Sequence, residues 1–189
     1  EQSNVDLYNK FVVFNIRDLE EELRPVGMYI VLNYIWNKVK GDKKKRILVV
    51  DEAWQLMKYE DSANFMFSIA KRARKYFLGL TTISQDVDDF LSSRMGRAVV
   101  SNSSLQLLLK QAPSSVDLIG ETFKLTSEEK ARLTTFPVGE GLFFAGLNHV
   151  VMRILASQTE GELITTTPQQ VAAQEAVDAY QQQAVEAEV

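Results

Sequence analysis

The chain has 189 residues, of which 46% are hydrophobic and 24% charged, a composition typical of a globular protein with room for one well-buried core. Its formal net charge of −4, from 21 Lys and Arg against 25 Asp and Glu, argues against a protein that binds nucleic acid over its whole surface. The absence of cysteine and the single histidine exclude disulfides, thiolate metal sites and histidine-rich metal cages, and no apolar run reaches the roughly 18 to 20 residues of a membrane span.

A strand and a helix are predicted before residue 42. Residues 10–16 form an apolar run typical of a strand, and Pro25 stands where a helix tolerates proline, in its first turn. The predicted helix ends near Gly41. Its apolar residues recur at spacings of three and four, at Met28, Val31, Leu32, Ile35, Trp36 and Val39. A basic run at residues 43–46 follows, which we interpret as a solvated loop, with contact to nucleic acid or a membrane as the alternative.

The most informative stretch is an apolar run at residues 47–50 that ends in two adjacent carboxylates, Asp51 and Glu52. An apolar run without polar alternation is typical of a parallel strand covered on both faces, and ligands in such sheets bind at the carboxyl ends of the strands. In sheet proteins that hydrolyse phosphate bonds, one acid at this place binds Mg²⁺ and its neighbour orients or deprotonates the attacking water. The alternative is a plain helix start, with acids near the positive end of the helix dipole.

A second polar strand end follows. Residues 61–77 predict a helix that is basic on its outer sides, and its apolar side is formed by Phe65, Ile69, Ala73 and Tyr76. Residues 79–84 predict a strand that ends at Gln85 and is followed by Asp86, Asp88 and Asp89. The polar ends of these two neighbouring strands are therefore candidates for one site.

The remaining elements are predicted from local signals. They are strand-like runs at residues 97–101 and 105–110, a short helix opened by Pro113, a helix capped by Thr126 or Ser127, and a β-hairpin of residues 141–146 and 149–154. The hairpin turn is placed at Leu147 and Asn148 because asparagine tolerates positive φ.

From Thr167 onward the chain is rich in Gln, Ala and Glu and has only a thin apolar stripe, which indicates a marginal helix or disorder. We therefore predict one domain over residues 1–164 and a tail over residues 165–189.

The polar residues combine into one candidate constellation: the acid pair, Gln85 at the next strand end, and Arg74 on the helix between them. A glutamine at this place can bind the attacking water or a terminal phosphate oxygen, and an arginine can stabilise charge on a transferring phosphoryl group, often on a neighbouring subunit. The alternatives are a surface glutamine and a solvated basic helix face.

Four segments, in this order, resemble the C-terminal motor domain of the large conjugation and type IV secretion ATPases, which belong to the HerA/FtsK group of RecA-like hexameric motors. The segments are residues 47–54, 70–76, 81–87 and 139–144, and the resemblance extends from about Phe11 to Ile164. It implies an α/β fold: a partial RecA-like P-loop NTPase core with a mostly parallel sheet flanked by helices, a C-terminal β-hairpin and a helical tail.

The resemblance also implies a role for each candidate residue. Asp51 binds Mg²⁺ through water, Glu52 activates the attacking water, and Gln85 is the sensor of the bound nucleotide. Arg74 reaches the nucleotide of an adjacent subunit, with Arg72 as the rival for this role. ATP and Mg²⁺ are the implied cofactors.

The family's phosphate-binding loop has no counterpart in these residues, because none of the nine glycines is followed by lysine. We therefore expect residues 1–189 to be a fragment that hydrolyses little or no ATP alone and needs the phosphate-loop half for tight nucleotide binding. The sheet should also lack a central strand beside the sensor strand. Such a gap leaves unpaired backbone and an apolar edge that favours aggregation.

The leading prediction of function is a part of an ATP-hydrolysing motor that energises type IV secretion or conjugative transfer. The longer polypeptide to which residues 1–189 would belong, here called the parent polypeptide, would form a homo-oligomer, a hexamer. It would lie at the cytoplasmic face of the bacterial inner membrane, in contact with channel and coupling proteins. One alternative is a DNA translocase or helicase that uses residues 43–46, although the net charge does not favour DNA binding. The other is a non-catalytic interaction module in which the acid pair caps a helix.

Overall fold

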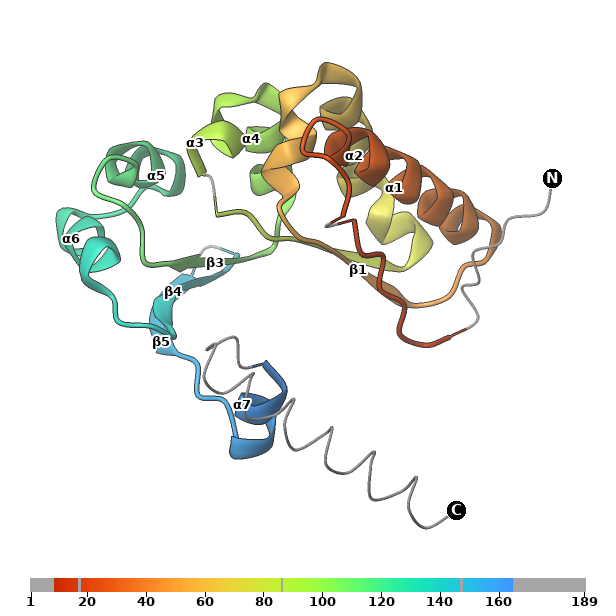
Figure 1. Ribbon diagram of the computed structural model, residues 1–189. Helices are drawn as coiled ribbons and strands as arrows, with labels where there is room; N and C mark the ends of the chain where they lie inside the picture. The colour runs from red at the N-terminus through yellow and green to blue at the C-terminus, as the bar shows by residue number, and fades with distance from the viewer. Residues whose placement is uncertain (1–8, 17, 86, 147, 165–189) are drawn as a thin grey trace, which may run out of the picture.

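The computed structural model describes residues 9–16, 18–85, 87–146 and 148–164 (Figure 1). No helix in these ranges has the length and the hydropathy that crossing a bilayer requires. With η for a 3₁₀ helix, the regular elements in chain order are α1 (Arg24–Gly41), β1 (Arg46–Val50), η1 (Ala53–Lys58), α2 (Glu60–Arg72), η2 (Ala73–Tyr76), β2 (Leu78–Thr82), α3 (Val87–Ser92), α4 (Arg94–Asn102), β3 (Leu105–Leu109), α5 (Val116–Phe123), α6 (Ser127–Thr135), β4 (Glu140–Ala145), β5 (Asn148–Arg153) and α7 (Gln158–Ile164).

Strands β1 and β2 form a parallel pair over their whole lengths. Because a parallel connection needs a crossover, η1, α2 and η2 lie between the two strands in the chain. Side chains alternate along β1, so that Leu48 and Val50 belong to the core whereas Ile47 and Val49 are 78% and 57% exposed. The expectation that this strand is covered on both faces is therefore wrong for the described residues, because helices cover one face only.

The larger hydrophobic core lies between this parallel pair and helices α1, η1, α2, α3 and α4. Helix α1 has Pro25 in its first turn, and its residues at spacings of three and four are buried: Met28, Leu32, Trp36 and Val39. The predicted helix over residues 61–77 forms as α2 followed by the 3₁₀ turn η2, and it ends at Phe77, which has a positive φ of 55°. Ile69 and Ala73 are buried, as its apolar side predicted.

Strands β3, β4 and β5 form an antiparallel sheet whose inner face packs against α5 and α6 in a second core. The predicted hairpin is confirmed as β4 and β5. Its turn lies earlier than predicted, because Asn148 already pairs with Ala145 and it is Gly146 that has the positive φ, 63°. Glycine takes this conformation without the steric cost that asparagine pays, which explains the difference.

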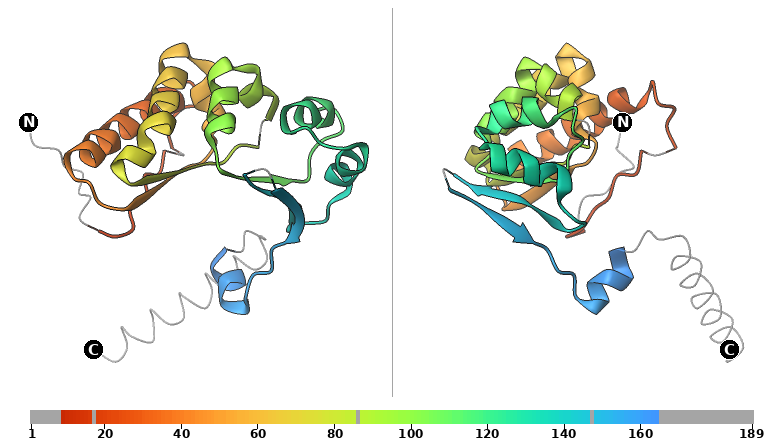
Figure 2. Two further views of the ribbon diagram at one scale, coloured as in Figure 1. Left: turned by 180° about the vertical axis from the view of Figure 1, so that it is seen from behind. Right: turned by 90° about the vertical axis from the view of Figure 1, so that its left-hand side faces the viewer.

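The two sheets are not hydrogen-bonded to each other, so among the described strands β2 has a partner on one side only. This arrangement agrees with the gap expected beside the strand that leads to Gln85. Figure 1 and the view from behind in Figure 2 show α1 to α6 on the same side of the strands. The opposite side presents apolar side chains that are 40% exposed or more: Ile47, Val49, Ile83, Leu105, Leu107 and Leu109. We call these six residues the open sheet face.

Two predicted strands are wrong. Residues 10–16 form no strand, and Phe11 and Val13 are 84% and 70% exposed, because no described strand lies beside them to accept their backbone hydrogen bonds. Residues 97–101 belong to helix α4. Its start is fixed by Ser93, whose hydroxyl accepts hydrogen bonds from the backbone N–H groups of Met95 and Gly96. The predicted tail over residues 165–189 and the acidic residue Asp86 lie outside the described residues.

Candidate functional site

The segments that follow β1 and β2 stay in register beyond the strands. The Ile83 N–H donates to the Val50 carbonyl and the Ala53 N–H donates to the Ile83 carbonyl, both at 2.9 Å. These two hydrogen bonds hold residues 51–53 and 83–85 side by side at the carboxyl ends of the strands. The sequence prediction that both polar strand ends meet at one edge is therefore confirmed.

Glu52 and Gln85 are in direct contact. The Gln85 Nε2 group donates a hydrogen bond to Glu52 Oε1 at 2.7 Å, across 33 positions of sequence. The Glu52 backbone is left-handed, with φ 52° and ψ 39°, and its N–H donates to Asp51 Oδ1 at 2.9 Å. Non-glycine residues in this conformation are uncommon and cluster at functional sites.

The helix-capping interpretation of the acid pair is not what the structure shows. Glu52 is the residue before η1, yet its side chain makes no capping hydrogen bond to that helix. Its Oε2 atom instead accepts a hydrogen bond from the indole Nε1 of Trp54, whose ring lies 4.5 Å from the Lys58 ammonium. Both oxygens of the Glu52 carboxylate are therefore engaged by side-chain donors.

A pocket of about 530 Å³ opens at these strand ends. Asp51, Glu52 and Gln85 all line it, and the segment after β3 closes it on another side. The other lining residues are Ile83, Ser84, Val87, Asp88, Leu109, Lys110, Gln111, Ala112 and Ser115. The pocket thus lies at the carboxyl ends of three strands, where α/β sheets bind ligands.

Sequence reasoning missed the contribution of the third strand end. The strand predicted over residues 105–110 ends at Leu109 in the structure, so Lys110 and Gln111 follow β3 as Asp51 and Glu52 follow β1. Ser115 was missed as well, and its hydroxyl donates to Asp88 Oδ2 at 2.9 Å, which ties the start of α5 to α3. Applying the strand-end rule to every predicted strand would have found Lys110 and Gln111.

The described residues contain no cluster of three or more acidic or histidine side chains that could enclose a metal ion. Mg²⁺ does not require such a cluster, because it is commonly bound by one or two carboxylates together with substrate phosphates and water. Asp51 is exposed at the pocket, and its carboxylate suits this role. The residues at this pocket are therefore suited to bind Mg²⁺ together with the phosphates of a nucleotide.

Arg72 and Arg74 lie far from this pocket in the same chain. They are exposed residues at the end of α2 and in η2, which precede β2, whereas Gln85 follows β2. A five-residue strand separates them, or about 16 Å at roughly 3.3 Å per residue. The structure therefore brings Asp51, Glu52 and Gln85 together and leaves both arginines at the opposite end of the parallel pair.

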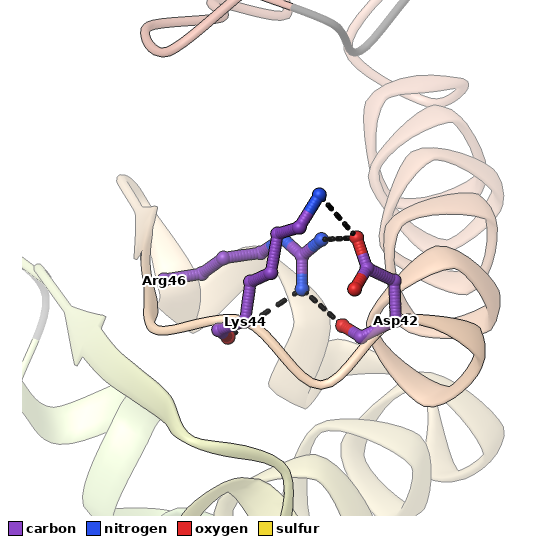
Figure 3. A network of polar contacts seen from close by, with 3 residues as sticks. All are labelled: Asp42, Lys44 and Arg46. Atoms are coloured by element: carbon purple, nitrogen blue, oxygen red, sulfur yellow. Dashed lines mark hydrogen bonds and ion pairs between the residues drawn. The ribbon is translucent and has the colours of Figure 1, made fainter.

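These arginines belong to a larger group of cations, the basic edge: Lys43, Lys44, Lys45, Arg46, Arg72, Arg74 and Lys75. The two contributing segments adjoin, because the Arg46 N–H donates to the Phe77 carbonyl at 3.1 Å. Asp42 Oδ2 lies 3.0 Å from both Lys44 Nζ and an Arg46 guanidinium nitrogen (Figure 3). The Lys44 ammonium beside Asp42 holds the pKa of that carboxyl below its usual value. Within the described ranges, the other five cations form no ion pair.

Comparison with known families and structures gives a consistent result. Residues 1–140 match the family model of the TraG P-loop domain. The structure resembles that of VirB4 of Thermoanaerobacter pseudethanolicus with a TM-score of 0.77 and 33% sequence identity, over 82% of this chain and 44% of that one.

Two curated relatives also match. The chain is 35% identical over 82 residues to the DNA import protein CedB of Sulfolobus acidocaldarius, and this match covers 40% of the chain and 14% of CedB. It is 30% identical over 112 residues to protein TraC of Escherichia coli, covering 54% of the chain and 13% of TraC. The matched region is thus a small part of each curated relative and less than half of the solved one.

Proposed function

Because the chain belongs to the TraG P-loop domain family of conjugation and type IV secretion motor ATPases, we propose that it supplies the half of a motor domain in which the attacking water is activated. The observation that carries this proposal is the 2.7 Å hydrogen bond between Gln85 and Glu52, beside Asp51, at one pocket. The parent polypeptide would use ATP hydrolysis to energise conjugative transfer or type IV secretion.

The three residues at the pocket divide the chemistry between them. Asp51 would hold Mg²⁺ through water, and the metal would supply positive charge that stabilises the transferring phosphoryl group. Glu52 would take a proton from the attacking water. Gln85, already bonded to Glu52, orients that water or contacts the terminal phosphate, so that its position depends on the nucleotide that is bound.

A complete active site needs two further groups that one copy of residues 1–189 does not supply to its own pocket: a phosphate-binding loop and an arginine from a neighbouring copy. A phosphate-binding loop is needed, since none of the nine glycines precedes a lysine, and we propose that residues 1–189 alone turn over little or no ATP. Arg74, or its rival Arg72, acts on the nucleotide of a neighbouring copy, because it lies at the far end of β2 from its own pocket. This role requires a closed ring of copies, which we propose to be a hexamer beside channel proteins at the cytoplasmic face of the inner membrane.

The test is Glu52→Gln in a polypeptide that joins a phosphate-binding loop to residues 1–189. We expect ATP hydrolysis to fall at least a hundredfold, since general-base catalysis contributes about 10²- to 10⁴-fold, while ATP binding is retained. The matched control is Glu60→Gln, an exposed acid in the first turn of α2 that does not line the pocket. Unchanged turnover in Glu52→Gln would remove Glu52 from the chemistry and favour the interaction module.

A second candidate function, a DNA translocase, is favoured by one observation. The basic edge gathers cations from two segments that precede β1 and β2, and five of them form no ion pair with any residue that the structure describes, although the whole chain carries a net charge of −4. One relative is named a DNA import protein. Lys and Arg groups that contact phosphates make DNA binding strongly dependent on salt.

The two candidates are separated by replacing Lys43, Lys44 and Lys45 with Gln. If the protein is a translocase, the unsubstituted parent polypeptide binds DNA, and this binding weakens as the salt concentration rises. The variant with three glutamines then loses the binding. If the parent shows no DNA binding at low salt, the translocase hypothesis is excluded and the basic edge serves another contact.

A further inference from the structure

The carboxylate of Glu52 is held by two donors of different character. Gln85 contacts Oε1 from an exposed position on the segment after β2. Trp54 contacts Oε2 from a half-buried position in η1, two residues after Glu52. A bond from an exposed amide is easily exchanged for water or substrate, whereas a bond from a packed ring is not.

Trp54 is fixed by its surroundings. Its ring packs against the larger hydrophobic core, and the Lys58 ammonium, one turn further along η1, lies 4.5 Å from the ring centroid. A cation over an indole face is attracted by the ring quadrupole, which restrains both groups. The neighbouring Ala53 and Leu56 are fully buried, so η1 is a firm base for the indole N–H.

We infer that Trp54 is a positioning residue for Glu52: its indole N–H anchors Oε2 so that Oε1 is directed to Gln85 and the pocket. The inference rests on the proposed function for its catalytic part. When Gln85 turns toward substrate, the Trp54 bond is the one that remains and keeps the carboxylate aimed. It also orients a side chain whose backbone is in an uncommon left-handed conformation.

The hydrogen bond itself can be tested in residues 1–189 without any turnover. The chain has two tryptophans, so the indole N–H signal that disappears from the NMR spectrum of Trp54→Phe is that of Trp54. In Glu52→Ala we expect this signal to move to the position of an indole bonded to water, while that of Trp36 stays. Glu60→Ala is the matched control. A Trp54 signal that is the same in Glu52→Ala as in the parent overturns the inference.

The positioning role is tested in the polypeptide that includes a phosphate-binding loop. Removal of a supporting hydrogen bond of this kind typically costs about 10- to 100-fold in activity, so we expect Trp54→Phe to lower kcat at least tenfold and to leave KM for ATP unchanged. The same substitution at the core residue Trp36, whose ring packs edge-on against Tyr76, should lower stability and leave kcat unchanged. Equal losses of kcat in the two variants, or none in Trp54→Phe, overturn the role.

The two proposals fail in distinguishable ways. If Glu52→Gln leaves turnover intact, the proposed function is wrong, and the NMR measurement still decides whether Trp54 binds Glu52. If Glu52→Gln abolishes turnover but Trp54→Phe does not lower it, the proposed function stands and the positioning role is wrong. Circular dichroism of Trp54→Phe establishes whether the variant is folded before its kcat is compared. If it is unfolded, the NMR spectrum of Glu52→Ala decides whether the inference stands.

Discussion

Glu52 carries two unusual features at once, a left-handed backbone and a carboxylate with both oxygens bound to side chains. A non-glycine residue in this conformation costs of order 1–3 kcal/mol, which the surrounding hydrogen bonds offset. The Ala53 N–H bond to Ile83 and the Glu52 N–H bond to Asp51 fix the backbone on both sides of the residue. The strain is therefore located at the residue to which we assign the proton transfer.

Gly96 shows a residue-scale constraint in the support of the site. A Cβ added there would lie 1.9 Å from the Phe90 carbonyl oxygen, a backbone atom of the neighbouring helix α3. Because backbone cannot move aside as a flexible side chain does, we expect Gly96→Ala to destabilise the fold by about 1–3 kcal/mol. Urea unfolding followed by tryptophan fluorescence measures this change.

The control for this prediction is Gly41→Ala, at the last residue of α1, where an added Cβ has no atom within 4 Å. Since alanine is a better helix former than glycine, this variant should be neutral or stabilised by less than about 1 kcal/mol. Equal destabilisation of the two variants would mean that the close approach at Gly96 is not the cause.

At the scale of elements, helix α6 is joined to strand β5 through one carboxylate. The Thr126 N–H donates to Glu129 Oε2 at 2.8 Å and the Glu129 N–H donates to the Thr126 hydroxyl at 3.3 Å, which forms a capping box on Thr126, one of the two predicted caps. The other oxygen of Glu129 lies 2.5 Å from His149 Nε2, and the His149 ring stacks on Phe144 at 4.8 Å. The cap and the hairpin are thus coupled.

This junction predicts a dependence of stability on pH. The hydrogen bond from the Thr126 N–H lowers the pKa of Glu129 in the folded chain below its ordinary value of 4.5. Below pH 4.5 the unfolded chain therefore takes up a proton that the folded chain does not, and the free energy of unfolding decreases as pH falls through the folded-state pKa. We expect Glu129→Gln to reduce this acid slope, as measured by urea unfolding between pH 6 and roughly pH 3.5.

Thr126→Ala is the control for the pH prediction. It removes the hydroxyl cap and should cost about 1 kcal/mol at every pH, but it keeps the backbone N–H that lowers the Glu129 pKa, so the acid slope should remain. An acid slope that is the same in Glu129→Gln as in the parent would show that other carboxyl groups cause it.

At the scale of the whole molecule, the dominant feature is the open sheet face together with the unpaired side of β2. Ile47 and Val49 are more than half exposed on a strand whose other side is buried. Exposed apolar strands with unpaired backbone favour association with other chains. We propose that the rest of the P-loop domain covers this face and fills the gap beside β2 in the parent polypeptide.

Residues 1–189 alone should therefore self-associate, and Ile47→Thr with Val49→Thr should reduce this, because threonine keeps the β-branch that strands favour and adds a hydroxyl. Sedimentation velocity over a range of concentrations measures the association. The matched control is Val138→Thr, a fully exposed residue in the turn before β4 that belongs to neither sheet. The prediction is contradicted if residues 1–189 without substitutions are monomeric and unfold cooperatively with high stability.

The sequence by itself determined the elements whose signals are local. The spacing of apolar residues placed α1, the cap signal at Thr126 or Ser127 placed α6, and the apolar run at residues 47–50 placed β1 with the acid pair at its end. These signals come from residues within a few positions of each other. Residues 97–101 were misassigned because a five-residue apolar window does not separate a strand from a helix, and Ser93, which caps α4, lies outside that window.

Only the tertiary structure decided how the strand ends meet. The contact of Gln85 with Glu52, the bond from Trp54 to the second oxygen of Glu52, and the approach of Lys110 and Gln111 to the same pocket join residues up to 60 positions apart. It also decided that one side of β1 is open, which the apolar run could not reveal. Side-chain direction at a strand end depends on the turn that follows and on the neighbouring strand, and neither is encoded in the run itself.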